Sequence, residues 1–93
     1  MSKPTISSLS HGDTVDGLQA VVLRKYPARR TPHGMMAAAC IRDRTGMAGL
    51  VLYGGQTRSI KAGDVLSITG MCIVSGDQKT LVKGEGGHLE VMA

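Results

Sequence analysis

The sequence contains no phenylalanine and no tryptophan, and two tyrosines are the only aromatic residues among its 93 positions. Because large aromatic side chains usually fill much of a protein core, the interior of this chain must be built from aliphatic residues, alanine and methionine. The length is that of one domain. Only three prolines occur beside thirteen glycines. This balance favours short strands joined by many turns.

Cysteines and long apolar runs are also scarce. Cys40 and Cys72 each lie inside an apolar segment, so we expect both to be buried free thiols rather than a disulfide. No run approaches the ~18 consecutive apolar residues of a membrane-spanning helix, and the first residues lack the apolar region of a signal peptide. We therefore expect no membrane partner and an intracellular location, which would be the nucleus in a eukaryote and otherwise the cytoplasm.

Acidic residues are nearly missing from the middle of the chain. Between Arg24 and Lys61 the only acid is Asp43, whereas the same stretch contains eight basic residues. The rest of the chain has more acidic than basic residues. Solubility requires charge but not this segregation, so the pattern favours a polyanionic partner such as nucleic acid. An ordinary solvated surface is the alternative.

The residue combinations that catalysis or metal binding needs are not found. Three histidines and two cysteines occur without the spacing of a zinc site, and no serine lies in a nucleophile elbow. The glycine-rich residues 84–87 are not followed by the lysine and hydroxyl residue of a phosphate-binding loop. We therefore predict a protein that is not an enzyme and has no metal or other cofactor.

Alternating apolar residues indicate strands, and the clearest pair surrounds a turn over residues 43–46. Asp43 suits the first position of such a turn because its carboxylate can accept from the backbone two residues on, and Gly46 tolerates the geometry of the fourth position. The pattern predicts a β-hairpin whose Ala48, Leu50 and Leu52 face the core, with Tyr53 facing outward. The prolines within residues 24–34 favour a loop or a frayed strand end there. We also expect strands over 15–23, 35–41, 65–74 and 80–82, a helix or a loop over 54–59, and a segment over 88–92 that completes the last strand or packs across the barrel end.

Five short motifs, in this order along the chain, resemble those of a known family. They are Ile6, Ser7, Ser8 and Leu9 with Gly12; Val21 to Leu23; the D-x-T-G of Asp43, Thr45 and Gly46; the I-x-x-G-D of Ile60, Gly63 and Asp64; and the G-x-G-G-x-L of residues 84–89. The set resembles the single-OB-fold, single-stranded-DNA-binding proteins of the SOSS-B type and their archaeal RPA-like relatives. The resemblance implies an all-β, five-stranded OB barrel over residues 1–93, in which 1–14 form a lead-in segment packed on the barrel. It also favours a strand for the alanine-rich residues 35–41, which by propensity alone would favour a helix.

The family resemblance implies non-catalytic binding of single-stranded DNA, or of RNA, in replication and repair. Such binding needs cations that follow the phosphates and flat side chains on which bases stack. Tyr53 occupies the position where the family carries a stacking aromatic residue, and the outer face of strands 35–41 and 47–53 would carry the ligand together with the basic first loop. The predicted nucleic-acid-binding residues are Arg24, Lys25, Tyr26, Arg29, Arg30, Arg42, Arg44, Tyr53 and Lys83.

The chain departs from the family where further aromatic residues are expected, because it has Met71, Ser75 and Val82 there. Each missing stacking platform would forfeit about 1–3 kcal/mol of binding. The outer face instead contains small and apolar residues, among which Met36, Val51 and Met71 could meet a protein partner. The alternative hypothesis is therefore an OB-fold adaptor subunit that binds a larger protein or a second copy of itself in a nucleic-acid-maintenance complex.

Overall fold

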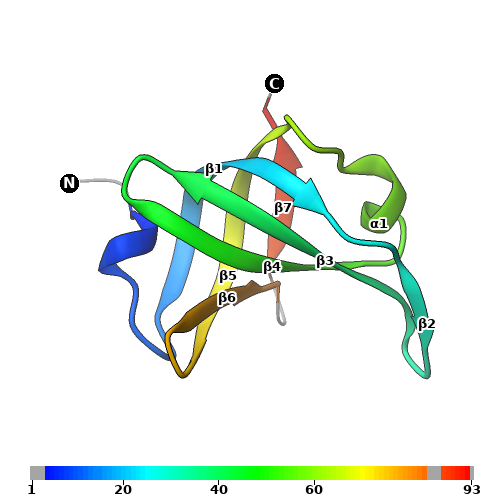
Figure 1. Ribbon diagram of the computed structural model, residues 1–93, viewed down its shortest axis with the longest axis horizontal. Helices are drawn as coiled ribbons and strands as arrows, with labels where there is room; N and C mark the ends of the chain where they lie inside the picture. The colour runs from blue at the N-terminus through cyan, green and yellow to red at the C-terminus, as the bar shows by residue number, and fades with distance from the viewer. Residues whose placement is uncertain (1–3, 84–86, 93) are drawn as a thin grey trace.

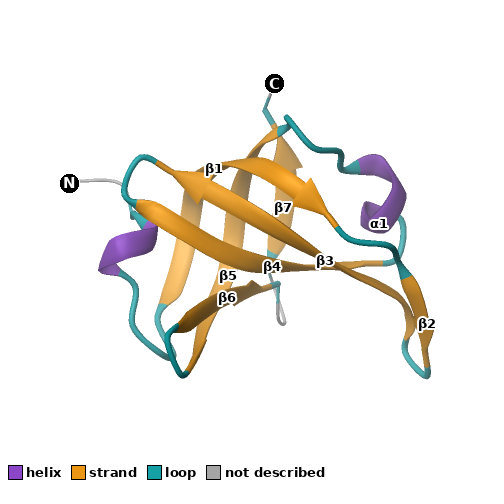
Figure 2. Cartoon of the chain, in the orientation of Figure 1, coloured by secondary structure: helices purple, strands orange, loops and turns teal. Residues whose placement is uncertain are grey.

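The computed structural model describes residues 4–83 and 87–92, which form a barrel of β-strands (Figures 1 and 2). No helix within these residues is long and apolar enough to cross a membrane. The elements in chain order are η1 (Ile6–Ser8), a single 3-10 turn; β1 (Thr14–Lys25); β2 (Arg29–Thr31); β3 (Gly34–Asp43); β4 (Gly46–Tyr53); α1 (Gln56–Ser59); β5 (Val65–Ser75); β6 (Gln78–Val82); and β7 (His88–Val91).

The barrel closes because each of its five main strands pairs on both sides. β1 pairs with β3 along one edge and with β5 along the other, β4 lies between β3 and β6, and β6 returns to β5. All of these pairings are antiparallel except the short parallel contact between β4 and β6. The predicted five-stranded all-β barrel is therefore confirmed, and the segment after β4 does contain a short helix, α1.

β1 can serve both neighbours because it bends at two irregular points. Its pairing with β5 is interrupted near Gly17, whose φ of 79° is a conformation that only glycine adopts readily. Its pairing with β3 shifts between Val22 and Arg24, so that Leu23 is an extra residue on the β1 side. Such bulges bend a strand and increase its twist, which is what a small closed barrel requires.

The core consists of aliphatic residues, alanine and Cys72, so the aliphatic part of the prediction is confirmed, but none of the described methionines is buried in it. Ala48, Leu50 and Leu52 of β4 are buried and alternate with residues of the outer face, so the predicted inward face of this strand is confirmed. The largest fully buried side chains are Ile6, Leu18, Ile41, Leu50, Leu52, Leu66, Ile68, Leu81, Val22 and Cys72.

Two predictions from the sequence are wrong in part. The basic stretch 24–34 is not one loop, because β1 continues as far as Lys25 and β2 pairs with the start of β3. Pro27 and Pro32 lie on either side of β2 rather than within it, so the strand keeps its N–H donors. Cys72 is buried, but Cys40 is only half-buried because it lies on the outer face of β3.

The last strand of the barrel is divided between β6 and β7, which pair with successive parts of β5. Gly70 lies on β5 at the point where β6 ends, and a Cβ atom there would come within 2.2 Å of the carbonyl oxygen of Val82. The backbones can approach this closely only because Gly70 has no side chain. Part of the glycine-rich motif 84–89 lies outside the described residues.

The turn between β3 and β4 holds the lead-in segment through Asp43. One carboxylate oxygen accepts from the N–H of Ile6 at 2.8 Å, and the other accepts from Thr45 N at 2.7 Å and Gly46 N at 3.0 Å. The Thr45 hydroxyl also accepts from the N–H of Ser7 at 3.0 Å. The D-x-T-G motif therefore closes the hairpin and fixes η1, which places Ile6 in the core.

These contacts control the charge of Asp43. Partial burial acts to raise its pKa, but the hydrogen bonds from Thr45, Ile6 and Gly46 outweigh burial and hold the pKa below its usual value. The unfolded-state pKa of an aspartate is about 3.9. The ionised carboxylate therefore stabilises the fold fully above that pH, and the stabilisation is lost as the pH falls through the lower folded-state pKa.

Asp43→Asn is expected to lower the free energy of unfolding by about 1–3 kcal/mol at neutral pH, because the amide removes the charge and turns an N–H group toward one of the donors. The deficit relative to the wild type should shrink as the pH falls from about 4 toward 2. Urea unfolding at several pH values measures both effects.

Asp77→Asn provides the matched control, because it makes the same change on the exposed turn after β5. It should alter the free energy of unfolding by no more than about 0.5 kcal/mol. A deficit for Asp43→Asn that stayed constant down to pH ~2 would contradict a stabilising role for the ionised carboxylate.

Candidate nucleic-acid interface

A groove of about 600 Å³ crosses the outer face of the barrel over β3, β4 and β6. Tyr26, directly after β1, lines the groove together with the β5–β6 turn. The floor between them consists of small residues on β3 and β4, namely Ala38, Cys40, Gly49 and Val51. A floor of this kind leaves the sheet surface open to a flat ligand.

Strand register aligns the residues of the floor. Ala38 is opposite Val51 and Cys40 is opposite Gly49 in the β3–β4 pair, and Gly49 is in turn opposite Thr80 of β6. A Cβ atom on Gly49 would lie 3.3 Å from the Thr80 hydroxyl and 3.5 Å from the amide nitrogen of Gln78. The side chains of Thr80 and Gln78 therefore lie close over Gly49, and a residue with a side chain would fit at this point of the floor only if they shifted.

The polar wall of the groove was not among the predicted site residues. It is formed by Ser75, Asp77, Gln78, Lys79 and Thr80, from the end of β5 and the start of β6. The Lys79 ammonium itself donates to the carbonyl oxygens of Ile6 and Ser7. The sequence indicates a turn at 75–78, and OB-folds commonly use the loop between their last two strands to bind oligonucleotides. That general rule was the available signal, but only the pairing of β4 with β6 brings this turn to the groove.

Both tyrosines are on the surface and occupy different places. Tyr26 is 46% exposed and is held beside the groove by its N–H, which donates to the carbonyl oxygen of Ala38 at 2.9 Å. Tyr53 is 38% exposed at the end of β4, opposite Met36, which is itself opposite Arg29 of β2. Arg29, Met36 and Tyr53 thus form a row across the arm that β2 and β3 extend from the barrel (Figure 1).

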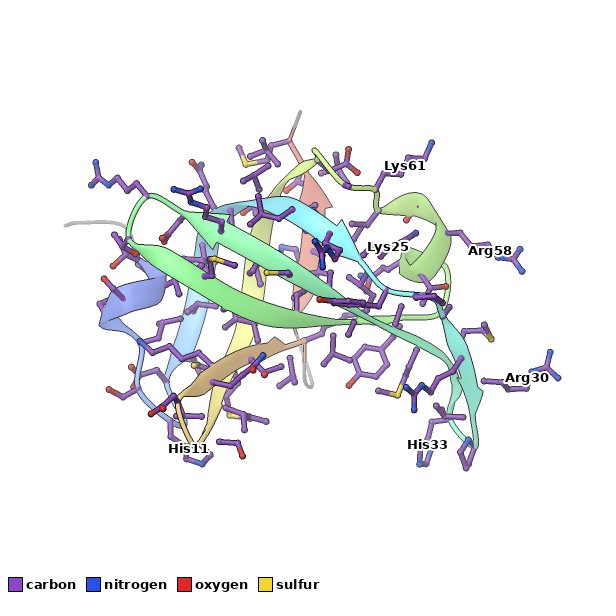
Figure 3. The ribbon with its side chains drawn as sticks, viewed as in Figure 1. His11, Lys25, Arg30, His33, Arg58 and Lys61 are labelled. Carbon is purple, nitrogen blue, oxygen red and sulfur yellow. The ribbon has the colours of Figure 1, made fainter. Side chains whose placement is uncertain are left out.

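The four cations predicted in the first loop point in different directions. Arg24 is exposed opposite Cys40 and borders the groove. Arg29 shares the face of Met36, whereas the neighbouring Arg30 is directed away from the barrel (Figure 3). Lys25 does not face the groove, because its ammonium donates to the carbonyl oxygen of Thr57 in α1 at 2.7 Å.

The other three predicted cations do not line the groove. Arg42 and Arg44 line a second hollow, on the side of β3 that faces β1. Arg42 pairs with Met47, which lines the groove, and with Val21, which lines the second hollow. Arg42 therefore lies between the groove and the second hollow. Lys83 is half-buried beyond the end of β6.

The residues suggested as a partner face are also separated. Val51 lines the groove. Met36 lies toward the arm, opposite Tyr53. Met71 is on β5, where it is 37% exposed and opposite Val82 of β6.

Comparison with known proteins identifies the fold. The chain matches a domain of replication protein A from Methanococcus maripaludis with a TM-score of 0.81 and 17% identity, covering 98% of this chain and 96% of that one. It also matches the HINb domain of p204 (TM-score 0.78, 23% identity, 98% of this chain and 47% of that one). A third match is a murine DNA-binding protein solved with double-stranded DNA (TM-score 0.74, 18% identity, 98% and 48%).

At these identities the similarity shows a shared OB-fold. The chain spans about half the length of the p204 and murine chains, and nearly all of the archaeal domain. No family model matches the sequence, and no curated protein matches it. The barrel topology and these matches together show that the chain folds as an OB-fold barrel.

Lys25→Met is expected to lower the free energy of unfolding by about 1–2 kcal/mol, because it removes a charged donor from the carbonyl oxygen of Thr57. Arg24→Met, which removes an exposed cation from the adjacent position, should change it by no more than about 0.5 kcal/mol. Equal effects of the two substitutions on thermal or urea unfolding would contradict the anchoring role of Lys25.

Proposed function

We propose that the chain binds single-stranded nucleic acid in the groove over β3, β4 and β6 and carries out no catalysis. The observation that carries this proposal is the combination of a low, apolar sheet floor with Tyr26 at its edge and Arg24 on its border. Bases can lie against the floor and the tyrosine ring while the guanidinium meets phosphate.

The small floor residues favour a single strand over a duplex. In a duplex the bases are stacked inside and the phosphates face outward, so the apolar floor at Ala38 and Val51 would meet only charged backbone. In a single strand the base faces are available for contact with that floor. The archaeal match is a domain of a replication protein, and the murine match was solved with double-stranded DNA, so a duplex belongs in the test as a competitor.

Binding in this groove would depend mainly on charge. Tyr26 is the one aromatic residue that lines it, and each stacked base contributes about 1–3 kcal/mol. The cations supply attraction that falls with salt and carries little sequence information. We therefore infer weak, salt-sensitive and largely sequence-independent binding, suited to the maintenance of exposed single strands during replication or repair. Comparing the affinities for oligo-dT and oligo-rU measures the preference between DNA and RNA.

Ala38→Glu should weaken binding of labelled oligo-dT and oligo-rU about tenfold or more, because a carboxylate on the groove floor repels phosphate and occupies the space of a base. Ala62→Glu is the matched control, since it adds the same side chain and charge at an exposed turn between α1 and β5. Fluorescence anisotropy at two salt concentrations, with an unlabelled duplex as competitor, measures the affinities.

Two results would contradict the proposed site. The first is the absence of any binding at low salt. The second is an equal loss of affinity in Ala38→Glu and Ala62→Glu when both are folded, which would mean that overall charge and not the groove determines binding. If an equimolar duplex displaces oligo-dT, the chain prefers a duplex to a single strand.

Arg29 and Arg30 are neighbours on β2, so substituting each one tests whether the direction of the arginine side chain affects binding. Arg29 shares the face of Met36 and Tyr53, and Arg30 is directed away from it. Arg29→Ala should therefore flatten the dependence of log affinity on log salt by about 0.7, the value for one phosphate contact, and Arg30→Ala by less than half of that. Equal slopes for the two variants would mean that the arm acts only through its net charge.

A further inference from the structure

The second hollow lies on the opposite side of β3 from the start of the groove. It has a volume of about 930 Å³ and is bounded by the outer face of β1 and by the lead-in segment around Thr5 and Ser8. Arg42 and Arg44 line the side formed by the β3–β4 turn. The proposed function does not use this surface.

The floor of this hollow is aliphatic. Val21 of β1 lies at its centre, opposite Arg42 on one side and opposite Val65 of β5 on the other. Leu23, the extra residue of the β1 bulge, is 43% exposed beside it. Neither tyrosine lines the hollow, so it presents branched side chains and no aromatic ring for a base to stack on.

Among the described residues, the one carboxylate that lines the hollow beside the two guanidinium groups is that of Asp43. The acid between them in sequence, Asp43, uses one oxygen for Ile6 N and the other for Thr45 and Gly46. The remaining polar side chains that line the hollow, those of Thr5, Ser8 and Gln19, are uncharged. The described residues therefore leave an aliphatic floor beside two exposed positive charges, Arg42 and Arg44, and the single negative charge of Asp43 between them.

We propose that this hollow docks an acidic protein segment that carries an aliphatic side chain. Its carboxylates would pair with Arg42 and Arg44, whose planar guanidinium groups fit carboxylates in two-pronged hydrogen bonds. Its aliphatic side chain would pack on Val21 and Leu23. A nucleic acid could satisfy the charges but would leave the aliphatic floor without a suitable partner, so the combination favours a protein.

The hollow and the groove are lined by different residues. They meet at the cross-strand pair of Arg42 and Met47, where Arg42 faces the hollow and Met47 the groove. A chain with both sites filled would connect an acidic protein to a nucleic acid through one barrel. Docking in the hollow stands on its own contacts and does not require that the groove bind nucleic acid.

Amide chemical shifts of the isotope-labelled chain test the proposal. The probe is a soluble peptide of glutamate and aspartate residues around a single leucine, and the control peptide has serine in place of that leucine. We expect the acidic peptide to shift the amides of Val21, Leu23, Arg42, Arg44 and Val65 at concentrations below about 1 mM. The serine peptide should bind at least about fivefold more weakly, because it loses the apolar contact.

Arg44→Glu should weaken peptide binding about fivefold or more, since it replaces an attractive charge pair by a repulsive one. Arg58→Glu makes the same change in charge on α1 and should weaken binding by no more than about twofold. Leu23→Ser tests the floor without changing charge and should weaken binding about fivefold.

Several outcomes would overturn the proposal. They are no amide shift in the hollow at about 1 mM peptide, equal effects of Arg44→Glu and Arg58→Glu, or shifts confined to groove residues such as Ala38 and Gly49. Oligo-dT that shifts the hollow amides and displaces the peptide would assign the surface to nucleic acid instead. Failure of oligo-dT to bind anywhere would contradict the proposed function and leave the peptide result as the test of docking.

Discussion

Closure of the barrel through β1 is the constraint on which the other features depend. An interior without aromatic rings must be sealed by close packing of aliphatic side chains from all five strands, so β1 has to reach both β3 and β5. The bulge at Leu23 makes this possible and also determines which way Leu23 and the next two side chains point. Leu23 joins the second hollow, Arg24 borders the groove and Lys25 turns to α1. One backbone irregularity therefore assigns three successive side chains to three different surroundings.

Sequence patterns predicted the hairpin and the core because both depend on local chemistry. The D-x-T-G turn carries its own hydrogen-bonding groups, and the alternation around Leu50 and Leu52 needs only the period of a strand. One further Asp43 contact, that to Ile6, joins residues 37 positions apart. Nothing in the local pattern indicates that contact, although the family resemblance placed both motifs in one fold.

The arrangement of the basic residues could not be predicted from their number. Eight cations in one stretch indicate an anionic partner, but the direction of each depends on strand register and bulges. Register directs Arg29 and Arg30 to different faces, a hydrogen bond to α1 holds Lys25 away from the groove, and Arg42 lines the second hollow instead of the groove. The polar wall at Gln78 was missed for a related reason, since the parallel contact of β4 with β6 has no signal within either strand.

The exposed positions of Tyr26 and Tyr53 have a spectroscopic consequence. In most proteins, intrinsic fluorescence reports on buried indole or phenol rings and therefore on folding. This chain has no tryptophan, and both of its tyrosines are at the surface. Tyr26 lines the groove, and Tyr53 lies near the arm. The emission of the chain should therefore change little when the barrel unfolds and should be quenched when a base stacks on either ring, so its natural chromophores report on the ligand and not on the core.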